Sequence, residues 1–186
     1  MLLTEDQQAL REVARRFARE RLRPDYQKRE AEAGVDRELH RQMGELGLLG
    51  VDLPQEHGGL GADSVTAGLI IEDIAYGDFN VSYLQLLASL MGSILARHAG
   101  PELAAAWVPK LARGEAIVGL GLTEPRGGSD AANLILRARR DGGEYLLSGE
   151  KTSMSFADQA DAAIVFARTG KAEEAAHGVS AFFVPM

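Results

Sequence analysis

The sequence predicts an α+β protein: an all-α helical bundle over residues 1–115, followed by a partial antiparallel β-sheet or barrel domain over residues 116–186. Apolar residues recur at helical spacing in the first part, and short β-branched runs replace them after Gly114. The Asp141–Gly142–Gly143 turn is typical of a tight hairpin and favours antiparallel pairing in the second part.

The first two helices carry the clearest start and stop signals. Thr4 can form a capping box with Gln7. The apolar face that follows consists of Leu10, Val13, Ala14, Phe17 and Ala18. The second helix is expected to begin near Asp36 and to end at Gly47, because glycine readily adopts the left-handed conformation that terminates helices. Between them, the mixed-sign stretch 19–32 is interpreted as a solvated face.

Three further helices complete the predicted bundle. The third covers residues 64–75 with Ser64 as its N-cap, and the fourth covers residues 80–99. The fourth is apolar on most faces, which indicates a helix buried within a bundle. The fifth begins at Pro101 and runs to about Leu111, since proline suits the first helical position.

Five short strands are expected after Gly114, at residues 116–122, 134–140, 145–151, 162–168 and 179–184. The last strand is apolar and stands at the end of the sequence. An unprotected apolar edge strand promotes association, so we expect further polypeptide to complete this domain.

Composition excludes several function classes. The net charge of −7 argues against a nucleic-acid partner, and the absence of cysteine excludes disulfides, thiolate metal sites and a cysteine nucleophile. The four histidines have no metal-ligand spacing, so no metal is expected. With no recognisable signal peptide and no apolar run of about 18 residues, we expect a cytoplasmic protein without a membrane partner.

The most informative segment is LGLTEPRGGSDAAN, residues 120–133, between two predicted strands. It combines hydroxyl groups with a glycine pair whose backbone N–H groups can approach a planar or phosphorylated ligand. An ordinary hairpin loop would have much the same composition, so the residues alone leave both interpretations open.

In sequence, this segment resembles the flavin-binding loop of acyl-CoA dehydrogenases, which has the form Thr-Glu-Pro, a glycine-rich triplet and Ser-Asp. Upstream, LGLLG at residues 46–50, LPQEHGGLG at 53–61 and IEDIA at 71–75 resemble further segments of that family in the same order. The resemblance covers essentially the whole chain. It implies FAD as cofactor and a C-terminal helical domain that is absent from these residues.

By this resemblance, seven residues would contact the cofactor: Leu120, Leu122, Thr123, Gly128, Ser129, Ser153 and Ser155. Leu120, Leu122 and Thr123 would edge the isoalloxazine ring, and Ser155 would face its N5 atom. Ser129 would also contact the CoA arm of the substrate. Arg126 replaces a usual glycine, and it either faces a phosphate or points into water.

Ser153 departs from the family pattern Gly-x-Lys-x-Trp-Ile-(Thr/Ser), because it stands where the tryptophan is usual. One interpretation is that the lost ring leaves room for a bulky or alicyclic acyl group such as cyclohexanecarboxyl. The alternative is that a neighbour, for example Phe156, fills the space.

The resemblance implies α,β-dehydrogenation of an acyl-CoA thioester, with α-proton abstraction and transfer of the β-hydride to the flavin N5 atom. No catalytic base is assigned. Glu124 is not assigned this role because it is a loop residue of the family motif. The implied partners are an acyl-CoA, an electron-transfer flavoprotein and copies of the chain in a homotetramer. The alternatives are an acyl-CoA oxidase, a flavin monooxygenase on the same fold, and a non-catalytic acyl-CoA- or flavin-binding module.

Overall fold

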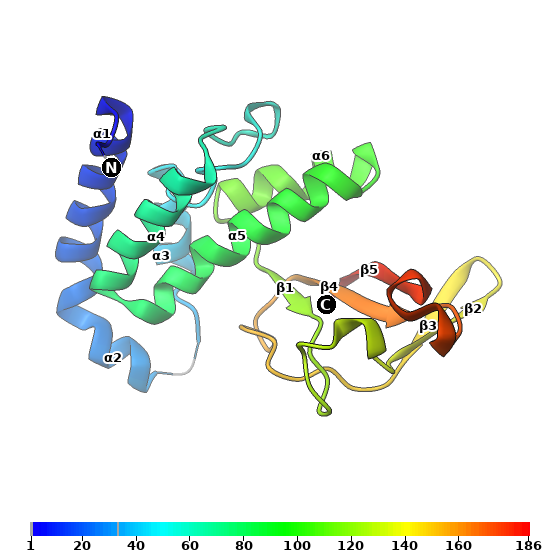
Figure 1. The fold of residues 1–186 in the computed structure, drawn as a ribbon. Coiled ribbons are helices and arrows are strands. Elements are labelled where there is room, and N and C mark those ends of the chain that lie inside the picture. Colours follow the sequence, from blue (N-terminus) through cyan, green and yellow to red (C-terminus); the bar gives the residue numbers. More distant parts are fainter. Residues whose placement is uncertain (1, 33) are drawn as a thin grey trace. The chain divides into compact units, whose positions relative to one another are not determined.

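The computed structural model describes residues 2–32 and 34–186, and its contacts divide the chain into two compact units, Met1–Ile117 and Val118–Met186. The first unit is helical and the second contains a five-stranded sheet (Figure 1). The predicted order of a helical region followed by a β region is therefore confirmed.

The N-terminal helix α1, Glu5–Phe17, begins as predicted. The Gln7 amide N–H donates to the Thr4 hydroxyl at 3.2 Å, and the Thr4 amide donates to the Gln7 side chain at 3.1 Å. The helical path then continues through a π-helical turn at Ala18–Leu22, a 3-10 turn at Arg23–Asp25 and helix α2 at Tyr26–Ala31.

Sequence reasoning missed α2 because mixed charges hide any apolar period there. The interpretation of residues 19–32 as a solvated face is wrong at Arg29, because the Arg29 side chain is only 18% exposed. The Arg29 guanidinium donates to the Asp78 carboxylate at 2.8 Å and to the Leu22 carbonyl. The charged stretch is therefore tied to the rest of the helical unit.

The remaining helices are α3 at Arg37–Glu45, α4 at Ser64–Gly77, α5 at Phe79–His98 and α6 at Pro101–Ala112, with a 3-10 turn at Gln55–His57. Helix α3 begins beside Asp36, close to the predicted start, and Asp36 is its N-cap. The cap of α4 is Asp63 and not Ser64, since the Asp63 carboxylate accepts the Thr66 N–H at 2.8 Å. Three of these helices thus begin after an aspartate, because Asp78 caps α5.

Large aliphatic side chains fill the centre of the helical unit. The fully buried ones are Leu22, Met43, Leu48, Leu49, Val51, Leu53, Ile70, Ile74, Met91 and Leu111. Small residues allow the close approach of these segments. A side chain at Gly92 would collide with Leu53, whose Cδ2 would lie 2.6 Å from the added Cβ.

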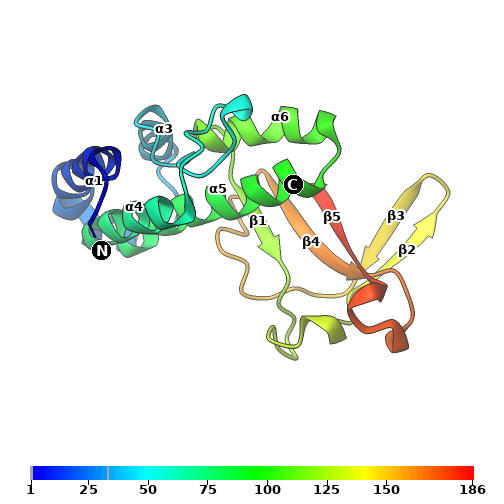
Figure 2. The same ribbon diagram turned by 45° about the horizontal axis from the view of Figure 1, so that its top comes forward.

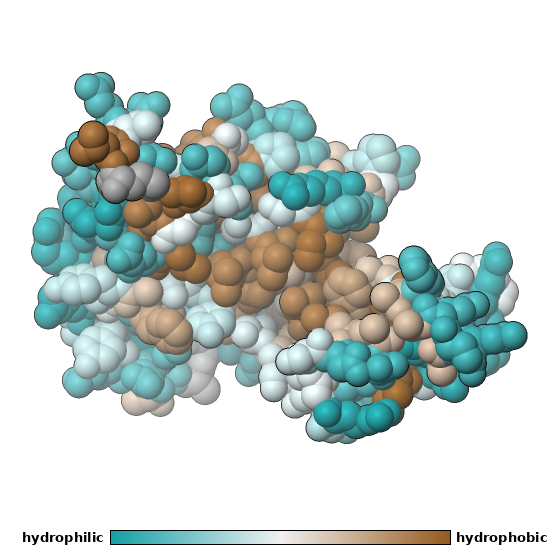
Figure 3. Space-filling view, viewed as in Figure 1, coloured by the Kyte–Doolittle hydropathy of each residue, from teal (hydrophilic) through white to brown (hydrophobic). Residues whose placement is uncertain are grey.

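Helix α5 combines a buried and an exposed apolar face. It is long and apolar enough to cross a membrane by length and composition, but 50% of that window is buried inside the protein, as in a core helix. Apolar side chains also gather along its visible face (Figure 3). Among them, Leu86 and Leu90 are each 41% exposed and Phe79 is 64% exposed. The expectation of no membrane partner stays a prediction.

The sheet contains β1 at Val118–Gly121, β2 at Arg137–Asp141, β3 at Glu144–Ser148, β4 at Ala162–Arg168 and β5 at Val179–Pro185. Strand β4 pairs with β1 and β5 along its length, and with β2 at Arg168 (Figure 2). Strands β2 and β3 form the predicted hairpin, closed by Gly142–Gly143.

The prediction of an antiparallel sheet is wrong for two pairings, because β1 and β2 both run parallel to β4. The hairpin and the β4–β5 pair are antiparallel. Parallel pairing requires a long connection, and the segment between β1 and β4 supplies one by containing the β2–β3 hairpin. The alternation of apolar and polar residues within one strand does not show whether a later strand will pair with it in the parallel or the antiparallel direction.

Candidate functional site

The two segments predicted to contact a cofactor, 120–129 and 153–155, lie next to each other in the β unit. The Thr152 amide N–H donates to the Thr123 carbonyl at 2.9 Å. The Lys151 ammonium donates to the Leu122 carbonyl at 3.0 Å. Residues separated by about 30 positions in the sequence thereby form one continuous surface.

The 151–154 segment lies beside two glycines of β1, and it approaches Gly119 most closely. A Cβ added to Gly119 would lie 3.1 Å from the Met154 Cε atom, and one added to Gly121 would lie 3.6 Å from the Lys151 Cγ atom. Successive residues of a strand point to opposite faces, so Gly119 and Gly121 share the face that receives the 151–154 segment. Leu120 lies on the opposite face and is half-buried.

The loop after β1 begins with a tight turn from Glu124 to Gly127. The Glu124 amide donates to the Gly127 carbonyl at 3.2 Å, and the Gly127 amide returns a bond to the Glu124 carbonyl at 2.9 Å. Gly128 then passes beneath Thr123, since an added Cβ at Gly128 would lie 2.8 Å from the Thr123 hydroxyl oxygen. The predicted residues Thr123 and Gly128 are therefore adjacent, and the exposed Ser129 follows them.

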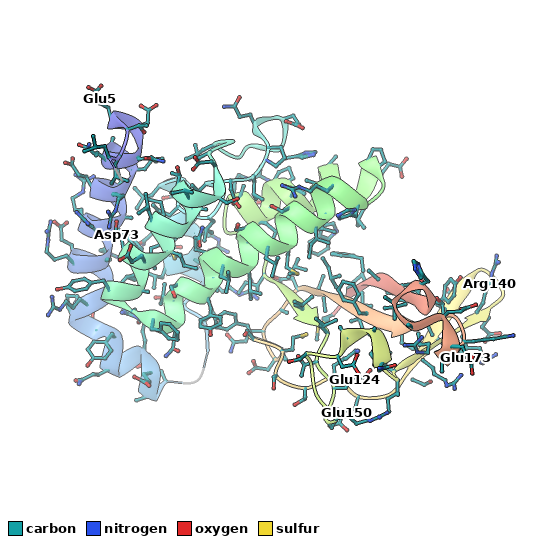
Figure 4. All side chains as sticks on the ribbon, in the orientation of Figure 1. Glu5, Asp73, Glu124, Arg140, Glu150 and Glu173 are labelled. Atoms are coloured by element: carbon teal, nitrogen blue, oxygen red, sulfur yellow. The ribbon has the colours of Figure 1, made fainter. Side chains whose placement is uncertain are left out.

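Glu124, labelled in Figure 4, is buried and anchors this loop. Its carboxylate accepts the Ile135 and Leu136 amide N–H groups at 2.7 and 2.8 Å and the Lys151 ammonium at 2.9 Å. Burial raises the pKa of Glu124, but these hydrogen bonds and the Lys151 charge outweigh it and hold the pKa below its ordinary value. Because hydrogen bonds already engage its oxygens, the Glu124 carboxylate is suited to holding the loop in place and not to abstracting a proton.

Arg168 fixes the far side of the same loop. It is buried, and its guanidinium donates to the backbone carbonyls of Leu134 at 2.9 Å and of Ala132. It also donates to the carbonyls of Lys171 and Ala175, both at 3.1 Å. The short helical turns Ala131–Asn133 and Ala172–Gly178 are thus held by one side chain.

Four hydroxyl groups of the two segments remain available to a ligand. Within residues 2–32 and 34–186, no other side chain or backbone group bonds the hydroxyls of Thr123, Ser129, Ser153 and Ser155. Ser153 is exposed and has a φ of 56°, a left-handed conformation that is uncommon for serine. Phe156, with a φ of 55°, is half-buried.

A polar cavity of about 300 Å³ borders the loop. Its lining includes Arg126 and Arg137 together with the polar side chains of Asp130 and Asn133. Arg126 is exposed, so its side chain is positioned to meet water or an anion.

Comparison with known sequences accounts for both units. The sequence model described as the acyl-CoA dehydrogenase N-terminal domain matches residues 4–115, and the model of the middle domain of that family matches residues 119–186. The chain belongs to the acyl-CoA dehydrogenase family.

Individual relatives agree with this assignment. The probable acyl-CoA dehydrogenase YngJ of Bacillus subtilis is 35% identical over 185 residues, which are 98% of this chain and 48% of the relative. A glutaryl-CoA dehydrogenase from Mycobacterium smegmatis, solved in complex with FADH2, has a TM-score of 0.88 and 31% identity over 98% of this chain and 46% of its own.

The fold is also shared with PigA, which was solved with FAD and proline. Its TM-score is 0.90 at 28% identity, and the match covers 100% of this chain and 49% of PigA. The chain spans about half the length of the curated relatives it matches, because the match covers 48% of the Bacillus subtilis protein.

The structure brings together most of the residues predicted for the site and adds others that the sequence did not reveal. Leu122 and Thr123 lie against the segment that carries Ser153 and Ser155, and Gly128 lies next to Thr123. The supporting roles of Glu124, Lys151 and Arg168 were not predicted, because their local sequence, rich in polar residues and glycine, does not show that they become buried.

Proposed function

We propose that this chain provides the helical and flavin-binding parts of an FAD-dependent acyl-CoA dehydrogenase. The observation that carries the proposal is the adjacency of the Leu122–Thr123 and Thr152–Ser155 segments, joined by the Thr152 N–H and the Lys151 ammonium. Membership of the acyl-CoA dehydrogenase family and the FADH2 bound to the Mycobacterium smegmatis relative support it.

The donors in these segments suit FAD. Hydroxyl groups at Thr123 and Ser155 can bond ring nitrogens and oxygens, and Ser129 with Gly128 offers donors to a pyrophosphate. The one buried carboxylate nearby, Glu124, is already neutralised by Lys151 and does not repel an anion. When bound, FAD supplies the acceptor for the hydride that leaves the β carbon of the substrate.

The second half of the reaction needs a base for the α-proton. No catalytic base is assigned within the described residues, since the Glu124 carboxylate is fully engaged by hydrogen bonds. We propose that the base comes from the part of the enzyme that corresponds to the other half of its relatives.

We further propose a bulky or alicyclic acyl group, such as cyclohexanecarboxyl, as the preferred substrate. Ser153 is small and exposed at a position where the family pattern has a large ring. By family resemblance we also propose an electron-transfer flavoprotein as acceptor and a homotetrameric assembly. The cytoplasmic location is proposed from the sequence features alone.

A second candidate keeps the cofactor and changes the substrate. PigA, solved with FAD and proline, has the same fold at a TM-score of 0.90. A flavin enzyme that acts on a substrate without CoA is therefore a distinct alternative. The same fold can also serve a flavin oxidase, in which oxygen replaces the flavoprotein as electron acceptor.

The test is the anaerobic visible spectrum of the native protein before and after addition of a panel of acyl-CoAs. We expect a flavin spectrum that bleaches with acyl-CoA, most completely with a cyclic one. A yellow protein that bleaches only with a substrate lacking CoA would favour the second candidate. A colourless protein that takes up no added FAD would contradict the cofactor assignment.

Substrate preference is tested separately with Ser153→Trp. An indole at this position should lower the rate of bleaching by cyclic acyl-CoAs and leave that by short straight-chain acyl-CoAs nearly unchanged. Equal rates for wild type and variant with the cyclic compounds would contradict a role of Ser153 in specificity.

A further inference from the structure

The ion pair of Lys151 and Glu124 is the most deeply buried one between oppositely charged side chains in the described part of the chain. The side chains are 9% and 4% exposed, and the Lys151 Nζ atom lies 2.9 Å from the Glu124 Oε1 atom. A buried ion pair is often no more stabilising than apolar residues of similar size. Stability alone therefore gives a weak reason for its presence.

The pair and its hydrogen-bond partners join three separate backbone segments, at residues 122–124, 135–136 and 151. Glu124 accepts the amide N–H groups of Ile135 and Leu136, and Lys151 donates to the Leu122 carbonyl. Because Lys151 stands two residues before Ser153 and Leu122 directly precedes Thr123, the ammonium lies where the two proposed flavin segments meet.

The aliphatic stem of Lys151 lies beside β1. Its Cγ atom lies 3.6 Å from the position of a Cβ at Gly121, which is an ordinary van der Waals separation. A single main-chain bond, from the Thr152 N–H to the Thr123 carbonyl, provides the parallel link between the same segments.

We propose that Lys151, held by Glu124, is a positioning residue for the flavin: it sets the separation of the Leu122–Thr123 and Ser153–Ser155 segments. This role rests on the proposed function. Lys151 acts through the Leu122 carbonyl and the backbone that follows it. Loss of the ammonium would leave both segments folded but at a less defined separation. One flavin could then no longer bond well to both segments at the same time.

The experiment compares Lys151→Met with wild type and with Arg11→Met. The control also removes a cation from a largely buried carboxylate, since Arg11 lies 2.6 Å from Asp73, but it does so in the helical unit. Each flavin-depleted protein is titrated with FAD by fluorescence quenching. Its thermal melting without flavin and its visible circular dichroism at saturating FAD are recorded in parallel.

We expect Lys151→Met to raise the dissociation constant for FAD on the order of tenfold, as for other residues that orient a binding group, and to change the circular dichroism of bound flavin. Arg11→Met should lower the melting temperature and leave both flavin readouts unchanged. A purely structural role of Lys151 would change only the melting temperature.

Wild-type affinity and an unchanged dichroism spectrum in Lys151→Met would overturn the positioning role alone. A wild-type protein that binds no FAD would overturn the proposed function and this role with it. If Lys151→Met does not fold, Lys151→Arg serves, because it keeps the charge but replaces the compact ammonium by a planar fork. We expect weaker FAD binding there too, and wild-type affinity would again overturn the role.

Discussion

The helical unit and the β unit are stabilised by different kinds of buried side chain. All of the largest fully buried side chains in the described part of the chain belong to the helical unit, and nearly all of them are aliphatic. In the β unit half of the buried apolar residues are alanines, as at Ala138, Ala163 and Ala167, and the buried charged residues are Glu124 and Arg168. Apolar packing orders helices, whereas charged side chains bonded to backbone groups fix the loops of the site.

Two of the buried carboxylates, Asp73 and Glu124, illustrate the difference. Asp73, on α4, is bonded to the side chains of Arg11 and Arg15 on α1, at 2.6 and 3.0 Å. Glu124 is bonded to two backbone N–H groups and one lysine. The first carboxylate joins two helices that are also held by their apolar faces, and the second determines the path of the main chain itself (Figure 4).

The largest expected effect follows from Arg168→Met. The variant leaves the carbonyls of Ala132, Leu134, Lys171 and Ala175 without this donor in a buried site. We expect a loss of about 3–5 kcal/mol in the free energy of unfolding, measured by denaturant titration. Hydrogen exchange should rise most in residues 131–136 and 171–178. A rise spread evenly over both units would contradict the local role of Arg168.

Leu53→Ala tests the helical side of the comparison. Leu53 is fully buried and lies against Gly59 and Gly92, which have no side chains that could move into a cavity. We expect a loss of about 2–5 kcal/mol, with increased hydrogen exchange in the helical unit and none in the loop at 120–129. A loss below about 1 kcal/mol would show that the surrounding helices collapse into the space.

Glu124→Gln should act through pH as well as through packing. The folded-state pKa of Glu124 lies below its ordinary value of 4.5, so its contribution is fully present above 4.5 and disappears as the pH falls through the folded pKa. We expect the variant to be less stable than wild type by about 1–3 kcal/mol near neutral pH. The difference in unfolding free energy should shrink as the solution is acidified, and a constant difference would contradict this linkage.

The smallest expected effect is that of Ser153→Gly. Serine at a φ of 56° is strained by about 1–2 kcal/mol, and glycine relieves this at a cost of about 0.4–1 kcal/mol in unfolded-state entropy. Flavin-free protein should therefore be unchanged or more stable by up to about 1 kcal/mol. Ser155→Gly is the matched control, since Ser155 has no positive φ. The control should be less stable than wild type, and equal behaviour of the two variants would argue against strain at Ser153.

Local signals in the sequence determined much of the fold. The capping box at Thr4 and the helix start near Asp36 appear as predicted, and the hairpin closes at Gly142–Gly143. Each depends on residues only a few positions apart, whose hydrogen bonds form regardless of the rest of the chain. The same local reasoning chose Ser64 instead of Asp63 as the cap of α4, because neighbouring cap residues differ only in which hydroxyl or carboxylate reaches the free N–H.

Tertiary structure alone decided the direction of β1 against β4 and the supports of the candidate site. Strand direction depends on the route of a connection about 40 residues long, which alternation of side chains does not encode. The sequence and its family resemblance indicated the residues of the two flavin segments, but not that Lys151 and Glu124, 27 positions apart, would join them. Burial makes such a pair energetically important, and burial exists only once the chain has folded.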